Sequence, residues 1–103
     1  MNQYNPDIIS DSEFEKVLKG VLLEKNKPGY SSNNIQLVFS RLEIISDHVF
    51  NNSPLNFEKK SFDSIRAFEE YDDSRHFIHN TELGRKIFDV FYYFAHYYKE
   101  DKK

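Results

Sequence analysis

The stretch that decides the fold is residues 31–54, which read SSNNIQLVFSRLEIISDHVFNNSP. Its apolar residues step by three and four positions, at Ile35, Val38, Leu42, Ile45 and Val49. This spacing brings them to one side of an α-helix, where they form the seam of a packed bundle. The stretch therefore predicts a helix buried along one face, and Phe39 and Phe50 are expected to widen that face.

The two ends of this predicted helix carry recognisable signals. Ser31 and Ser32 favour a start, because a serine hydroxyl can accept a hydrogen bond from a free backbone amide of the first turn. The run Asn51-Asn52-Ser53-Pro54 favours a stop, because proline has no amide proton to continue the helix. We expect the helix to occupy the residues between these signals.

A second helix is expected upstream. Ser10-Asp11-Ser12-Glu13 matches the capping box, in which the serine hydroxyl and the glutamate carboxylate satisfy free amides reciprocally. The run 26–29 (Asn-Lys-Pro-Gly) is expected to end this helix, with Gly29 permitting a positive φ. Residues 1–10 are predicted to form an irregular lead-in. The apolar face consists of Phe14, Val17, Leu18, Val21 and Leu22.

The C-terminal half predicts two more helices. The first spans roughly residues 57–71, with a start as late as Ser61, and residues 72–80 are expected to be a connection that tucks Phe77 and Ile78 onto the core. Asn80 or Thr81 is expected to cap the last helix, and residues 99–103 form a charged tail. The seam of the last helix is predicted at Leu83, Ile87, Val90, Phe94 and Tyr97.

These elements predict an all-α fold, a four-helix bundle with short connections. The chain has 103 residues, enough for one core, so we expect residues 1–103 to form a single helical domain with flexible ends at 1–10 and 99–103. No apolar run is long enough to cross a bilayer, and the first residues lack the pattern of a secretory signal. The absence of cysteine fits a cytoplasmic protein.

An acidic run with a tyrosine inside it is the first candidate site. It comprises Glu69, Glu70, Tyr71, Asp72 and Asp73. These carboxylates are expected at a helix C-terminus, where negative charge is unfavourable, so a positively charged partner surface would relieve their repulsion. The alternative is a solvated helix end. A net charge of −3 argues against nucleic acid as the ligand.

The second candidate is the aromatic block 88–98, where seven of eleven residues are Phe or Tyr. A central, buried helix is the favoured interpretation, with tyrosine hydroxyls reaching water at positions 92, 93, 97 and 98. Exposed members would instead anchor a protein interface. An assembly subunit with a homodimer seam along this helix is a further alternative.

Catalytic and metal sites have weaker signals. Arg41 and His48 are separated by six residues on one predicted helix, a spacing that resembles the Arg-x4–6-His motif of the HEPN ribonuclease superfamily. That resemblance implies a cation and a proton-transferring imidazole beside an RNA phosphate. His76 and His79 lack the further ligands that zinc requires. We therefore expect no metal, no cofactor and no enzymatic activity.

A broader resemblance concerns the whole layout. The opening run 10–16 (Ser-Asp-Ser-Glu-Phe-Glu-Lys), the acidic connection, Arg75 and the helix start 81–83 (Thr-Glu-Leu) resemble bacterial immunity proteins of the colicin D and contact-dependent growth inhibition type. The likeness covers most of the chain in size and helix order. It implies a monomer that binds a cognate protein toxin one-to-one through the acidic run 69–73. Another small phage or antitoxin-type inhibitor is the alternative within this class.

Overall fold

The computed structural model describes residues 8, 10–30, 32–55, 58 and 71–98. Over these residues it contains a short 3-10 turn at Pro28–Tyr30, four α-helices and no strand. The helices are α1 (Asp11–Leu22), α2 (Asn33–Asn51), α4 (Asp72–Asn80) and α5 (Glu82–His96). The predicted all-α bundle is confirmed.

Two of the predicted features fall largely or wholly outside the described residues. These are the helix expected over 57–71 and the charged tail at 99–103. Most of the predicted lead-in lies outside them too, but Ile8 is buried in the core and Ser10 caps α1.

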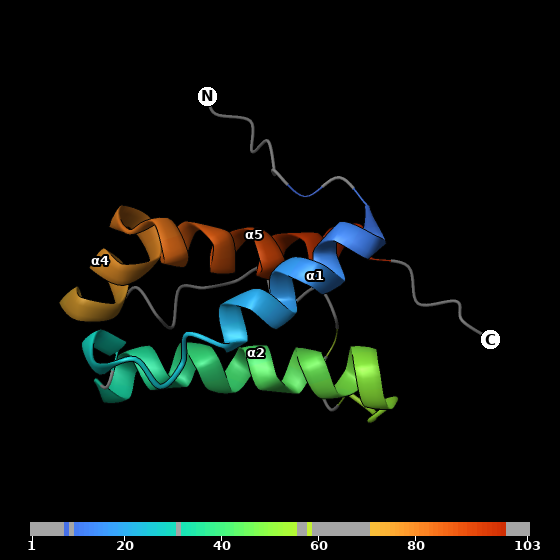
Figure 1. Ribbon diagram of the computed structural model, residues 1–103, viewed down its shortest axis with the longest axis horizontal. Helices are drawn as coiled ribbons and strands as arrows, with labels where there is room; N and C mark the ends of the chain where they lie inside the picture. Colours follow the sequence, from blue (N-terminus) through green and yellow to red (C-terminus); the bar gives the residue numbers. More distant parts are fainter. Residues whose placement is uncertain (1–7, 9, 31, 56–57, 59–70, 99–103) are drawn as a thin grey trace.

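The helices pack around α5, which lies against α1, α4 and α2. In Figure 1, α2 and α5 follow the long axis of the molecule, α1 crosses between them in the view, and α4 lies at one end. Phe14, at the start of α1, stacks on Tyr93 and Phe94 near the end of α5, with ring centroids 5.4 and 6.1 Å away. Aromatic packing therefore fixes one end of α1 on α5.

The capping serines of α1 and α2 are confirmed. The Ser10 hydroxyl accepts a hydrogen bond from the amide of Glu13 at 3.1 Å, and the Ser32 hydroxyl accepts one from the amide of Ile35 at 3.3 Å. At the other end of α2, Asn52 adopts the left-handed conformation with φ 59°. Asparagine tolerates this conformation better than most residues, so it terminates the helix.

The expected end of α1 is wrong. The helix stops at Leu22, and Gly29 does not adopt a positive φ but belongs to the 3-10 turn at Pro28–Tyr30. The amides of Leu23 and Glu24 already reach back only three residues, to the carbonyls of Gly20 and Val21, at 3.2 and 3.1 Å. Such tightening satisfies the last carbonyls and ends the helix without a glycine.

The buried face of α2 follows the predicted seam at four of its five positions. Val49 is only half-buried, and of the two added phenylalanines only Phe39 is buried. Phe50 is 37% exposed, and the ammonium group of Lys19 lies 4.8 Å from its ring centroid. A cation over the face of a ring is attracted to it, so Phe50 joins α1 to α2 at the surface.

Residues 72–80 are not the connection that the sequence analysis predicted, because they form α4. Phe77 and Ile78 are buried as expected, and Ser74 joins them on the same face. This buried face has only three members, too few to show a clear period in the sequence. The overlooked signal is the pair Asp72 and Asp73 in the first turn, where a helix favours negative charge.

The corner between α4 and α5 consists of one residue, Thr81, which caps α5 as predicted. Its hydroxyl accepts a hydrogen bond from the amide of Gly84 at 2.9 Å and donates one to the carbonyl of Phe77 at 2.7 Å. A Cβ atom on Gly84 would lie 1.7 Å from that same carbonyl oxygen. No residue other than glycine fits at position 84 without moving one helix.

Gly84→Ala is expected to destabilise the protein by about 3 kcal/mol, the upper part of the range for overpacking, because the added methyl group collides with backbone. Gly20→Ala is the matched control, since a Cβ there meets nothing within 4 Å. It is expected to raise the free energy of unfolding by about 0.5–1 kcal/mol, because alanine favours a helix over glycine by that amount. Urea unfolding followed by circular dichroism measures the free energy of unfolding of both variants. Equal changes in the two variants would contradict the close contact between Gly84 and the Phe77 carbonyl.

Candidate partner-binding surface

The acidic run begins outside the described residues, where Glu69 and Glu70 fall, and continues into α4. Tyr71 is the N-cap residue of α4, and Asp72 and Asp73 are its first two residues. Their expected place at a helix C-terminus is therefore wrong. At the N-terminus the helix dipole stabilises both carboxylates, so no partner is needed to relieve an unfavourable helix end.

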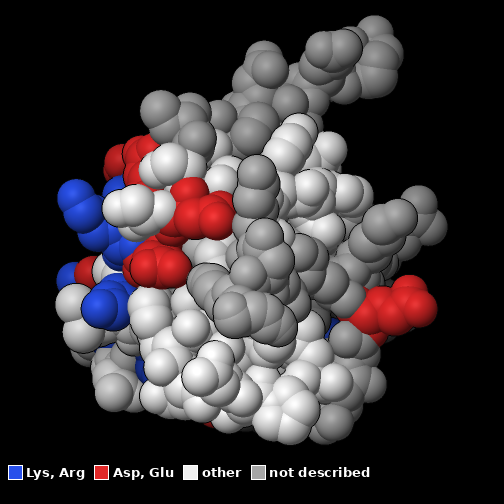
Figure 2. All heavy atoms as spheres, turned by 90° about the vertical axis from the view of Figure 1, so that its right-hand side faces the viewer, with Lys and Arg blue, Asp and Glu red and all other residues white. Residues whose placement is uncertain are grey.

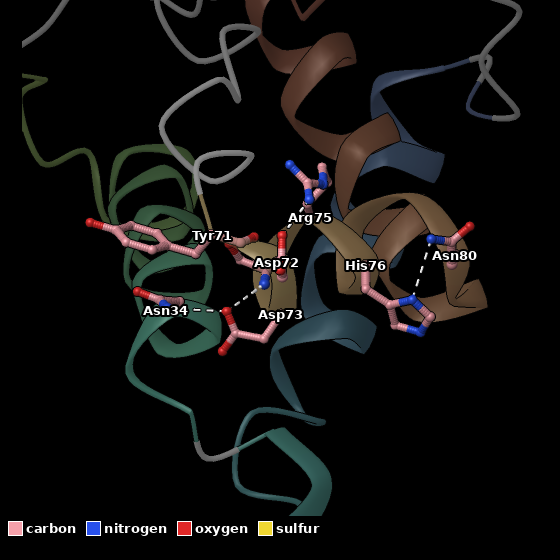
Figure 3. A network of polar contacts seen from close by, with 8 residues as sticks. Asn34, Tyr71, Asp72, Asp73, Arg75, His76 and Asn80 are labelled. Carbon is pink, nitrogen blue, oxygen red and sulfur yellow. Dashed lines mark hydrogen bonds and ion pairs between the residues drawn. The ribbon is translucent and has the colours of Figure 1, made fainter.

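Tyr71 and Asp72 face the solvent. The Tyr71 residue is 50% exposed, and Figure 3 shows its side chain directed away from α4. The Asp72 side chain is 94% exposed and forms an ion pair with Arg75, one turn further along the helix. An exposed pair of this kind contributes little to stability, so a partner can replace it at small cost.

Asp73 has a different role, because it joins the starts of two helices. One carboxylate oxygen accepts hydrogen bonds from the Asn34 side chain at 3.1 Å and the Ser74 amide at 2.8 Å, and the other accepts one from the Ser32 hydroxyl at 2.5 Å. The Asn34 bond is drawn in Figure 3. The bond from Ser32, followed by that from Asn34, lowers the pKa of Asp73 below its ordinary value.

The lowered pKa of Asp73 predicts a pH dependence. Because the folded pKa lies below the ordinary value of 3.8, the carboxylate stabilises the fold above that pH and loses its effect as the pH falls further. The stability difference between wild type and Asp73→Asn is therefore expected to shrink on acidification. Urea unfolding at a series of pH values measures it, with Asp72→Asn as the control that does not touch α2. A difference independent of pH would contradict the link between α2 and α4.

The aromatic block is mainly core, as favoured. Phe91, Tyr93, Phe94 and Tyr98 are buried, whereas Tyr97 is 50% exposed and Tyr92 is half-buried. The predicted seam position at Tyr97 is therefore wrong. The helix ends at His96, and the amide of Tyr98 bonds back to the carbonyl of Tyr93 at 2.9 Å, which turns Tyr98 onto the core instead.

The buried tyrosine hydroxyls bind carboxylates of α1 rather than only water. Tyr93 donates to Asp11 at 2.8 Å, and Tyr98 donates to Glu15 at 3.4 Å. Burial, followed by the bond to Asp11, raises the pKa of Tyr93 to about 12. These bonds give the polar ends of two core rings a partner on the neighbouring helix.

Spectrophotometric titration is expected to show a late step at about pH 12 from the Tyr93 phenol. Because the folded pKa lies above the ordinary value of 10.0, the stabilisation is complete below pH 10.0 and disappears as the pH rises toward 12. In Tyr93→Phe this last step should be missing. If the late step persists in that variant, another tyrosine carries it.

The candidate catalytic pair lies on α2, where Arg41 and His48 are both half-buried. The Nδ1 atom of His48 lies 2.7 Å from the carbonyl oxygen of Ser53, and its ring stands edge-on to Phe94 at a centroid distance of 6.0 Å. His48 therefore joins the end of α2 to α5 through these contacts. The ribonuclease interpretation stays a prediction.

The histidines of α4, His76 and His79, are exposed. The Nδ1 atom of His76 lies 3.3 Å from the side-chain amide of Asn80, and this pair is marked in Figure 3. Within the described part of the chain, no three acidic or histidine side chains gather as metal ligands would. None of the described helices combines the length and apolarity needed to cross a membrane.

Surface charge is mixed in sign on the face seen in Figure 2. Acidic and basic groups lie next to each other along its left margin, a further acidic group lies at the right, and most of the other described atoms in view are uncharged. Adjacent opposite charges cancel at a distance, so the described part of this face does not present the uniform positive field that holds phosphates.

A groove that the sequence analysis missed lies between α1 and the first half of α5. Its volume is about 710 Å³. Val17, Gly20 and Val21 line it from α1, Leu83 from α5, and Tyr30 from the 3-10 turn. The sequence signal that could have indicated this groove is Gly20. A glycine inside a helix lowers stability and therefore indicates a packing or functional constraint.

Comparisons with protein-family models, with curated proteins and with solved structures found no significant match to this chain.

Proposed function

We propose that this protein is a non-enzymatic inhibitor of the immunity type, which binds a cognate toxin with a nuclease domain in the cytoplasm and blocks its active site in a one-to-one complex. The observation that carries the proposal is the outward position of Tyr71 and Asp72 at the start of α4. Tyrosine is enriched among residues that dominate binding energy, and a carboxylate can take the place of a phosphate in a basic cleft.

The support beneath these two residues favours binding. Asp73 fastens the start of α4 to the start of α2, and the Thr81–Gly84 corner holds its other end against α5. A helix held at both ends loses little conformational entropy when a partner binds its first turn. The net charge of −3 would also speed the encounter with a cationic nuclease surface.

The test uses nuclease toxin domains, including any encoded beside this gene, expressed in bacteria with and without the protein. Growth should be rescued from one of them, and calorimetry should show one-to-one binding. The double variant Tyr71→Ala, Asp72→Asn is expected to weaken binding by about a hundredfold, equivalent to about 2.7 kcal/mol. Asp73 is left unchanged because it holds the fold together.

The control is Tyr97→Ala with Asp47→Asn. Tyr97 is exposed to the same 50% as Tyr71, and Asp47 is an exposed acid on α2. This variant is expected to bind almost as the wild type does. Equal losses in both double variants would place the interface elsewhere. Metal-independent RNA cleavage by the purified protein that disappears in His48→Ala would favour the ribonuclease alternative.

A further inference from the structure

The groove between α1 and α5 has the size of a ligand-binding site. Its residues on α1 run from Glu13 to Val21, about two helical turns or roughly 12 Å, and Glu24 extends the lining beyond the end of the helix. Its volume of about 710 Å³ falls within the range of ligand-binding clefts. A groove lined along two neighbouring helices suits a third helix better than a compact small molecule.

Gly20 gives an independent reason to assign a ligand to this groove. It lies inside α1 in the lining of the groove, has no positive φ, and a Cβ there would meet nothing within 4 Å. Neither backbone conformation nor packing within the described residues requires glycine at this position, in contrast to Gly84. A bare backbone that costs helix stability allows another backbone to approach closely.

The chemistry of the groove indicates what kind of segment fits. The lining includes apolar side chains, at Val17, Val21 and Leu83. The lining also carries more carboxylates than ammonium groups, at Glu13, Glu24, Glu82 and Asp89 against Lys16 and Lys86, and of these Glu24 forms an ion pair with Lys27. An apolar stripe flanked by Lys and Arg complements both features.

We propose that this groove binds an amphipathic, basic helix of a partner protein, with an apolar stripe against Val17, Val21 and Leu83 and its backbone closest to α1 at Gly20. The site is separate from Tyr71 and Asp72, which lie at the start of α4, whereas the groove reaches Thr81 at the end of that helix. The inference therefore does not depend on the toxin proposal.

The probe is a synthetic helix of about 14 residues, roughly four turns, with leucine along one face and lysine at the flanking positions. Calorimetry and amide chemical shifts of the labelled protein follow its binding. We expect binding, with the largest shifts at Gly20, Leu83 and Lys86. The same peptide with glutamate in place of lysine should not bind.

Variants at Gly20 and at Glu82 distinguish binding in the groove from nonspecific electrostatic attraction of the basic peptide. Gly20→Phe places a ring in the groove and is expected to weaken binding at least tenfold, and Gly20→Ala, which adds a methyl group where the partner's backbone comes closest, is expected to weaken it severalfold. Glu82→Gln removes a lining carboxylate and is expected to weaken binding severalfold, while Asp47→Asn on α2 should not. Circular dichroism checks that each variant is folded.

Several outcomes would overturn the proposal. These are absence of binding by the lysine peptide, binding by folded Gly20→Ala and Gly20→Phe that equals binding by the wild type, and shifts centred on Tyr71 instead of Gly20. Sedimentation that shows self-association blocked by Gly20→Phe would assign the groove to a second copy of this chain. Because the assay contains no toxin, its failure leaves the proposed inhibitor function untouched.

Discussion

The contact between the backbone of Gly84 and the carbonyl of Phe77 is the constraint on which the described fold depends. With a single residue, Thr81, between α4 and α5, the two helices meet so closely that a Cβ at position 84 would lie 1.7 Å from that oxygen. The Thr81 hydroxyl bonds on both sides of the corner. This close approach lets Phe77 and Ile78 enter the core while the opposite face of α4 remains in solvent.

In the core, aromatic rings pack α1 against α5, and the hydroxyl groups of the buried tyrosines also form hydrogen bonds between the two helices. Phe14 stacks on Tyr93, and the Tyr93 hydroxyl donates to Asp11 of the same neighbouring helix. An aromatic ring contributes a large apolar area, but its hydroxyl must keep a hydrogen bond when it is buried. Of the four tyrosines at the end of α5 and just beyond it, Tyr93 and Tyr98 are buried, Tyr92 is half-buried and Tyr97 is 50% exposed.

The acidic run shows that the effect of clustered carboxylates on stability depends on which end of a helix carries them. The same carboxylates that would repel one another at a helix C-terminus are stabilised at the start of α4. Asp73 is exposed as well, but its carboxylate is occupied by Ser32 and Asn34, which leaves Tyr71 and Asp72 as the described part of the run that a partner can contact without breaking the link to α2. The proposed interface is accordingly smaller than the sequence suggested, and it rests on a firmly held helix end.

Local pattern was sufficient to predict the all-α class, the caps at Ser10, Ser32 and Thr81, and most of the seam of α2, because these depend on side-chain period and on hydrogen bonds within one turn. It was insufficient for α4, for the early end of α1 and for the inward turn of Tyr98, because each depends on contacts or backbone bonding that no periodic signal records. The sequence pattern also could not predict that Asp73 bonds to both α4 and α2, or that a groove lies beside Gly20. Both arise only where helices distant in sequence lie together, and that proximity is a property of packing.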